Sequence, residues 1–201
     1  MGAAEAFWPP LDLLYPTPPP PSRPTLTMGW KMGMLGEKTE AGGMTVRERE
    51  VLVAVVDGQG GGMGRGLVEA VKRAWPDLRV RALGTNALAT AAMLKAGADD
   101  GATGENAIAV NAARADVVLG PVGVAIPNGL LGEVTPRMAE AVGESAAAKI
   151  LLPSQRCGIR LAVGPVQPMQ FYLDQAVSLL AQELDRLGWA PKKDDGSICH
   201  E

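Results

Sequence analysis

Apolar residues along the chain gather in short continuous runs that are separated by stretches of mixed polarity. Val51–Val56 is such a run, rich in β-branched residues, as a parallel strand buried on both faces requires. The runs Arg79–Leu83, Asp116–Leu119 and Lys149–Leu152 have the same character, and Ile159–Val163 is a candidate fifth. The length of these runs is typical of strands rather than helices.

Helix signals fill the segments between these runs. Apolar residues at helical spacing form one face after the first run, and two later segments begin with residues that cap helices. The signals are Met63, Leu67, Val68, Val71 and Trp75 for the first helix, Asn86 for the second, Thr135 with Pro136 for a third that ends near Ala148, and Pro168–Leu187 for the last. The alternation predicts an α/β fold, a Rossmann-like three-layer domain with a mostly parallel sheet of about five strands.

Composition divides the chain into three parts. Prolines are concentrated between Pro9 and Pro24, which favours polyproline II or disordered backbone, with a docking peptide for a proline-recognising domain as the alternative. We therefore expect residues 1–48 to be a disordered leader, residues 49–188 to form the Rossmann-like domain, and residues 189–201 to be a polar tail. Met44 directly precedes the first folded segment, so we expect a chain beginning there to fold as stably as the full chain.

Charge and residue usage exclude several classes of function. The formal net charge is −3, so no basic surface is expected for nucleic acid. No apolar run approaches the roughly 18 residues of a membrane span, and no secretory signal is visible. Cys157 and Cys199 are too few for a disulfide framework, and together these features predict a cytoplasmic protein. The single histidine, His200, is next to the last residue, so neither a histidine-dependent triad nor a metal site is expected.

A glycine-rich loop, Gly58–Gly64, follows the first strand and opens the first helix. Glycine permits a sharp turn and a close approach of the backbone to a ligand, while the helix N-terminus offers unpaired N–H groups and a positive dipole end. A phosphate group fits both features. The spacing of Gly58, Gly62 and Gly64 resembles the cofactor loop of short-chain dehydrogenases. A tight turn that needs glycine only for packing is the alternative.

Two departures argue against dehydrogenase chemistry. The dinucleotide fingerprint expects an acidic residue at the end of the second strand to hold the ribose, but Thr85 and Asn86 follow that strand here. The Tyr-x-x-x-Lys pair of short-chain dehydrogenases is also absent, because Tyr172 is followed four residues later by Ala176. We therefore expect no redox catalysis of this type, whereas Thr85 and Asn86 remain candidates to bind a sugar or phosphate.

The carboxyl ends of parallel strands share one edge of a sheet, which is where open α/β sheets bind ligands. Polar or small residues follow each predicted strand, and the loop Gly101–Asn106 is expected to fold over the same edge. The candidate cofactor-binding residues are Gly58, Gln59, Gly60, Gly61, Gly62, Met63, Gly64, Gly84, Thr85, Asn86, Gly120, Pro121 and Gly123. The same edge is expected to carry Asn128, Glu133, Ser154, Gln155, Arg156 and Cys157.

Asp57 and Glu105 are the candidate catalytic residues, as general bases or as ribose-binding groups. The alternative roles are a turn cap for Asp57 and a helix-capping or solvated position for Glu105. Arg156 has two open interpretations, a partner of a ligand phosphate or a solvated side chain. Cys157 is interpreted as a small buried residue, because a nucleophilic cysteine needs a histidine partner.

Specific motifs between Val51 and Val163 resemble a known family. They are VVDGQGGGMG, ALGTNALATAAMLKAGA, GATGENAI, ADVVLGPVGVAIPN, GEVTP and the KILLP strand. The chain resembles a bacterial family named domain of unknown function 3842, and the resemblance covers more than half of it. The family implies a Rossmann-like domain and leaves the activity open. In that family the chain begins close to the first strand, so the proline-rich leader is a departure from the pattern.

These features predict that the domain binds a nucleotide, NAD(P)-like, or another phosphate-bearing small molecule at the glycine-rich loop. A non-catalytic ligand-sensing or interaction module and a small phosphate-ester lyase are the alternatives. The expected partner is a phosphate-bearing small molecule, while nucleic acid and membrane are not expected, and homo-oligomerisation stays open.

Overall fold

A computed structural model gives the structure of the protein and describes residues 50–154, 159–162 and 165–191. The fold is a five-stranded sheet in the order β3-β2-β1-β4-β5, and every neighbouring pair of strands is parallel. The strands are β1 (Leu52–Asp57), β2 (Arg79–Gly84), β3 (Asp100–Thr103), β4 (Val117–Pro121) and β5 (Ala148–Leu152). The predicted α/β fold class is thereby confirmed. The expected leader and the end of the polar tail lie outside the described residues.

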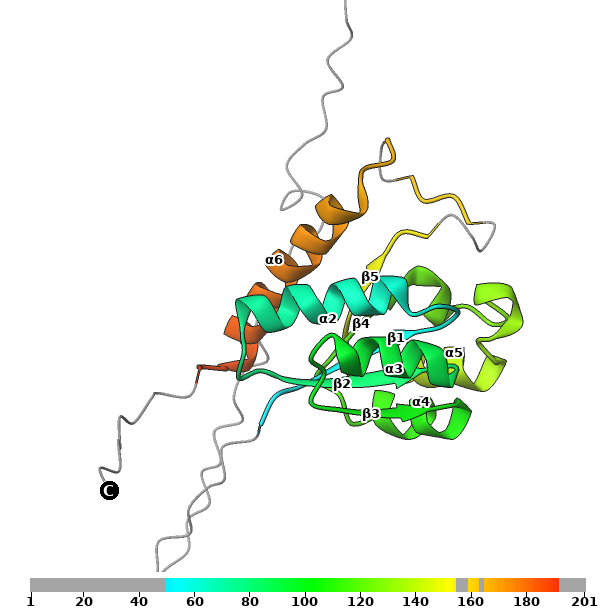
Figure 1. Ribbon diagram of the computed structural model, residues 1–201, viewed down its shortest axis with the longest axis horizontal. Coiled ribbons are helices and arrows are strands. Elements are labelled where there is room, and N and C mark those ends of the chain that lie inside the picture. The colour runs from blue at the N-terminus through cyan, green and yellow to red at the C-terminus, as the bar shows by residue number, and fades with distance from the viewer. Residues whose placement is uncertain (1–49, 155–158, 163–164, 192–201) are drawn as a thin grey trace, which may run out of the picture. The chain divides into compact units, whose positions relative to one another are not determined.

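Helices cover both faces of the sheet, and all but the last of them lie between successive strands (Figure 1). They are α2 (Gly62–Ala74), α3 (Ala87–Lys95), α4 (Glu105–Ala112), α5 (Pro136–Glu144) and α6 (Met169–Leu187), with the short 3₁₀ turns η1 (Val122–Ala125) and η2 (Leu130–Gly132) before α5. Both predicted caps are confirmed: the Asn86 side chain accepts from the N–H of Ala89, and Thr135 accepts from that of Met138. The third predicted helix ends at Glu144 instead of near Ala148, because Ala148 already belongs to β5.

The central strand β1 separates two apolar cores. Val53 and Val55 face the core shared with α2, α3 and α6, while Ala54 and Val56 face the core shared with α4 and α5. All four side chains are at most 1% exposed. Burial on both faces explains why the strand is a continuous apolar run rather than an alternating one.

The identity of the fifth strand corrects the sequence prediction. Ile159–Val163 was only a candidate for the fifth strand, and its described part, residues 159–162, contains no strand, while Val163 lies outside the described residues. The remaining strand of the sheet is instead β3, which overlaps the segment expected to be a loop, Gly101–Asn106. Two of its four residues are exposed and none is a large apolar residue, so the hydrophobic pattern carries no strand signal there.

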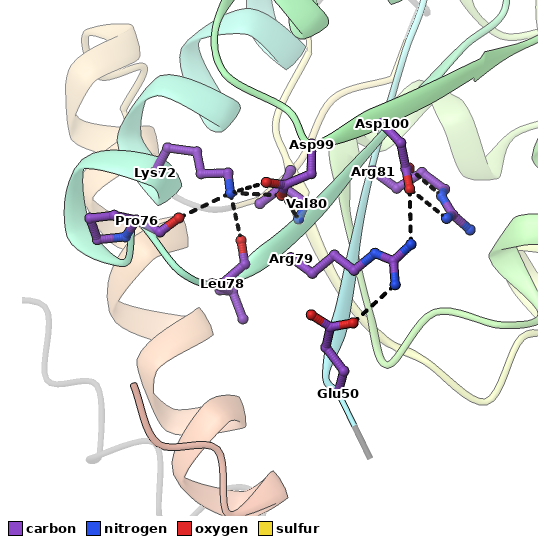
Figure 2. Close-up of polar contacts among 9 residues, drawn as sticks. All are labelled: Glu50, Lys72, Pro76, Leu78, Arg79, Val80, Arg81, Asp99 and Asp100. Atoms are coloured by element: carbon purple, nitrogen blue, oxygen red, sulfur yellow. Dashed lines mark hydrogen bonds and ion pairs between the residues drawn. The ribbon is translucent and has the colours of Figure 1, made fainter. Parts of the chain in front are cut away.

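Charged side chains attach β3 to β2 at the amino ends of the strands, away from the glycine loop (Figure 2). Arg81 donates to Asp100 over 2.7 Å, and Arg79 donates to the same carboxylate over 3.1 Å. The hydrogen bond from Arg81 is the main reason that the pKa of Asp100 lies below its ordinary value. Lys72 of α2 also reaches Asp99, the residue before β3. These ion pairs add to the small apolar contact that Ala102 of this edge strand makes with the core.

The helices within the described ranges are too short or too polar to cross a membrane.

Candidate functional site

The carboxyl ends of β1, β2 and β4 bring the predicted site segments to one edge. Asp57 pairs in register with Gly84, the N–H of Thr85 donates to the Asp57 carbonyl over 3.0 Å, and β4 ends beside β1 at Pro121. The chain continues from β1 to β2 and β3 on one side and returns to β4 on the other, so the topological switch point lies between β1 and β4. Open α/β sheets bind ligands at this position.

The structure places the glycine loop between β1 and α2. Gly58 to Gly61 form a turn, closed by the Gly61 N–H donating to the Gly58 carbonyl over 2.9 Å, and Gly62, Met63 and Gly64 form the first turn of α2. Gly84 ends β2, Gly120 and Pro121 end β4, and Gly123 follows in η1. The predicted binding residues are therefore drawn from loops at one edge of the sheet.

The Asp57 carboxylate ties the two ends of the glycine loop together. One oxygen accepts from the N–H of Gly58 over 2.8 Å and the other accepts from that of Gly64 over 2.6 Å. The side chain is 4% exposed. Burial, the largest influence, raises the pKa of Asp57, although the N–H groups of Gly64 and Gly58 act to lower it. Asp57 thus holds the loop as an acceptor, which is the turn-cap role.

Glu133 makes a second set of hydrogen bonds that link loops across the same edge. Its Oε2 accepts from the N–H of Gln59 over 2.8 Å, from the Thr85 hydroxyl over 2.6 Å and from the Asn86 amide over 2.9 Å. Partial burial acts to raise the pKa of Glu133, but these hydrogen bonds outweigh it and the pKa is lowered. The loop before α5 is therefore fastened to the glycine loop and to the end of β2.

Sequence reasoning placed Glu133 at this edge without a role. Its partners lie 74, 48 and 47 residues away along the chain, so no spacing motif could reveal these hydrogen bonds. The loop that carries Glu133 has an unusual backbone, with positive φ at Asn128, Leu130 and Leu131.

The glycines of the loop fall into two groups. A Cβ atom at Gly58 would lie 2.6 Å from the Thr85 hydroxyl, and one at Gly64 would lie 2.6 Å from the Met93 sulfur. Gly61 has a φ of +67°, and a Cβ there would lie 2.7 Å from the Ala89 Cα. These three positions require glycine for the fold itself.

Gly60 and Gly62 form the other group. Both are exposed, neither has a positive φ, and a Cβ atom at either would meet nothing within 4 Å. Among the described residues, neither backbone N–H has a hydrogen-bond partner. Packing therefore explains Gly58, Gly61 and Gly64 but leaves Gly60 and Gly62 unexplained.

The glycines that end the neighbouring strands are packing positions. A Cβ at Gly84 would collide with the Thr90 hydroxyl, and one at Gly120 would collide with the carbonyl oxygen of Val56. Both lie at the site edge, but each allows a close approach within the protein. Their presence is therefore accounted for without a ligand.

Glu105 takes a position apart from the glycine loop. It is the first residue of α4, after the edge strand β3, and Arg137 donates to it over 3.3 Å. A hydrogen bond from Thr135 is the first cause that lowers the pKa of Glu105, followed by Arg137. Its contacts join α4 to α5, and none of them joins it to Asp57 or to the loop.

The remaining candidates come after β5 in the chain. Ser154 follows β5, and Gln155, Arg156 and Cys157 lie outside the described residues. Across the part of the chain that the structure describes, no three His, Cys, Asp or Glu side chains are grouped as metal ligands.

Comparison with known proteins places the chain in a family. No curated protein matches it. A similar solved structure is a dodecameric FMN-dependent Ubix-like decarboxylase from Escherichia coli O157:H7, which is 16% identical, has a TM-score of 0.36, and aligns over 70% of this chain and 96% of that chain. The model of one family matches residues 52–185, which is well over half of the chain. The chain therefore belongs to the family described as domain of unknown function (DUF3842).

Proposed function

We propose that the domain binds a nucleotide, or another phosphate-bearing small molecule, with the phosphate on the backbone of Gly60 and Gly62. The observation that carries this proposal is that these glycines are exposed, have N–H groups without a partner among the described residues, and have open space where a side chain would stand. The absence of side chains would let a phosphate oxygen approach the backbone closely enough to accept hydrogen bonds from these N–H groups.

The position of the two N–H groups supports an anionic ligand. Gly62 is the first residue of α2, a helix of 13 residues, so its N–H lies at the positive end of the helix dipole. The Asp57 carboxylate already occupies the N–H of Gly64. A phosphate would therefore bind at the exposed side of the loop, at Gly60 and Gly62, rather than along the whole loop.

The hydrogen bonds of the two candidate catalytic carboxylates, Asp57 and Glu105, favour ligand binding over a reaction. Both Asp57 oxygens accept backbone N–H groups, and Glu105 is held by Thr135 and Arg137. A general base needs a free oxygen within reach of the proton that it abstracts. We therefore favour a ligand-binding domain over the phosphate-ester lyase and assign no catalytic step.

Gly62→Val tests the proposal because it fills the open space without straining the turn. Gly62 lacks a positive φ, so valine fits the backbone, while its branched side chain projects where the phosphate would lie. We expect ligand-induced stabilisation to be lost, because a ligand raises the melting temperature only when its concentration is comparable to or above its Kd for the native state. The measurement is the rise in melting temperature with millimolar AMP, ADP, NAD+ or inorganic phosphate.

Gly143→Val is the matched control, since Gly143 lies in α5, is exposed and also has nothing within 4 Å of a Cβ. It should keep the full ligand-induced rise. The proposal is wrong if none of these probes raises the melting temperature of the wild type, or if Gly62→Val keeps the same rise as Gly143→Val.

A further inference from the structure

The end of β2 lacks the carboxylate that dinucleotide-binding domains use to hold a ribose, because Thr85 and Asn86 stand there. The structure brings a carboxylate to that position from a different loop. Oε2 of Glu133 lies 2.6 Å from the Thr85 hydroxyl and 2.9 Å from the Asn86 amide. An acidic group is thus present at the end of β2 in space, although it is absent there in sequence.

The two oxygens of Glu133 have different surroundings. Oε2 accepts all three hydrogen bonds that the side chain makes to Gln59, Thr85 and Asn86. Oε1 has no donor among the described residues. Every buried side-chain oxygen in that part of the chain has a hydrogen-bond partner, so Oε1 is accessible to solvent. One oxygen therefore fixes the carboxylate, and the other is held in place as an unused acceptor.

We propose that Oε1 of Glu133 accepts a hydrogen bond from the ribose 2′-hydroxyl of a bound nucleotide, and so selects ribose that carries no 2′-phosphate. This inference rests on the proposed function, since it needs a nucleotide whose phosphate lies on Gly60 and Gly62. Glu133 accepts from the N–H of Gln59, the residue next to Gly60, so its carboxylate lies beside the proposed phosphate position.

The chemistry of the acceptor sets the order of ligands. A hydroxyl that donates to a carboxylate forms a charge-assisted hydrogen bond, which a 2′-deoxyribose cannot form. A 2′-phosphate would bring a second anion against the carboxylate and would bind worse still. The wild type should therefore bind AMP at least about tenfold more tightly than 2′-deoxy-AMP, and adenosine 2′,5′-bisphosphate most weakly.

Glu133→Gln separates the anchoring role from the recognition role. The amide oxygen of glutamine replaces Oε2 and keeps its three donors, whereas the amide NH2 replaces Oε1 and presents donors to the ligand. We expect the melting temperature without ligand to stay close to that of the wild type. The ligand order should change, because the bisphosphate gains affinity on losing the carboxylate and AMP loses its charge-assisted bond.

Glu140→Gln is the matched control, because it makes the same substitution at an exposed position of α5 outside the site. It should keep the melting temperature and the wild-type order of ligands. Affinities of the three nucleotides for the wild type and both variants are measured by isothermal titration calorimetry.

The outcomes separate this inference from the proposed function. If none of AMP, ADP, NAD+ and inorganic phosphate binds the wild type, both are wrong. If one of the other probes binds and AMP does not, only the assignment of Glu133 is overturned. If AMP and 2′-deoxy-AMP bind the wild type equally, or if Glu133→Gln keeps the wild-type order, only the assignment of Glu133 is overturned. A changed order in Glu133→Gln together with an unchanged order in Glu140→Gln supports it.

Discussion

Gly61→Ala should lower the free energy of unfolding by about 3 kcal/mol. Gly61 has a φ of +67°, and a Cβ atom there would lie 2.7 Å from the Cα and 3.0 Å from the carbonyl oxygen of Ala89. The left-handed backbone costs about 1–2 kcal/mol for a residue with a side chain, and the collision is with backbone that cannot rotate away. Urea unfolding at pH 7 measures the loss.

Gly60→Ala is the control for this prediction, one residue earlier in the same turn. Gly60 lacks a positive φ, and a Cβ there meets nothing within 4 Å, so its substitution should change the free energy of unfolding by less than about 1 kcal/mol. Equal losses for the two variants would contradict the division of the loop into packing glycines and open glycines.

Asp57→Ala should cost about 3 kcal/mol as well. The substitution removes the acceptor for the N–H groups of Gly58 and Gly64, at a position that is 4% exposed. A buried donor without a partner costs about 1–3 kcal/mol, and two are created here. The measurement is again urea unfolding, and a loss below about 1 kcal/mol would show that the loop holds its shape without this carboxylate.

The pKa of Asp57 adds a pH dependence that Asp57→Asn should remove. Burial is the largest cause that raises this pKa above 3.8, so the folded protein holds the proton more tightly than the unfolded chain does. The associated stability is fully present below the unfolded pKa and is lost as the pH rises through the folded pKa. As the pH rises above the ordinary pKa of an aspartate, the wild type should therefore lose stability relative to Asp57→Asn. A constant difference would contradict the raised pKa.

The part of the fold that follows from apolar patterning could be predicted. Val53 to Val56 are buried on both faces, and the capping side chains of Asn86 and Thr135 act through local hydrogen bonds, so each leaves a signal in nearby residues. The edge strand β3 leaves none, because it has no large apolar residue and ion pairs of Asp100 with Arg81 and Arg79 help to hold it. Charged residues at those positions look like a solvated loop in sequence.

The site could be located from sequence, but its internal contacts could not. Strand ends mark the edge, so the neighbourhood of Gly58, Gly84 and Gly120 followed from the parallel order of the strands. The hydrogen bonds of Glu133 depend on how the loop before α5 folds back. That loop has positive φ at non-glycine residues, and the partners of Glu133 lie far along the chain. The distinction between open and packed glycines likewise needs the surrounding atoms.

Backbone amide NMR during titration with AMP tests the central claim most directly, because each glycine of the loop reports separately. The account predicts that the amide signals of Gly60 and Gly62 shift most and saturate together, while that of Gly64, which already donates to Asp57, shifts less. Signals of Gly60 and Gly62 that stay unchanged up to millimolar AMP would contradict it, as would the largest shifts appearing at the amino ends of the strands.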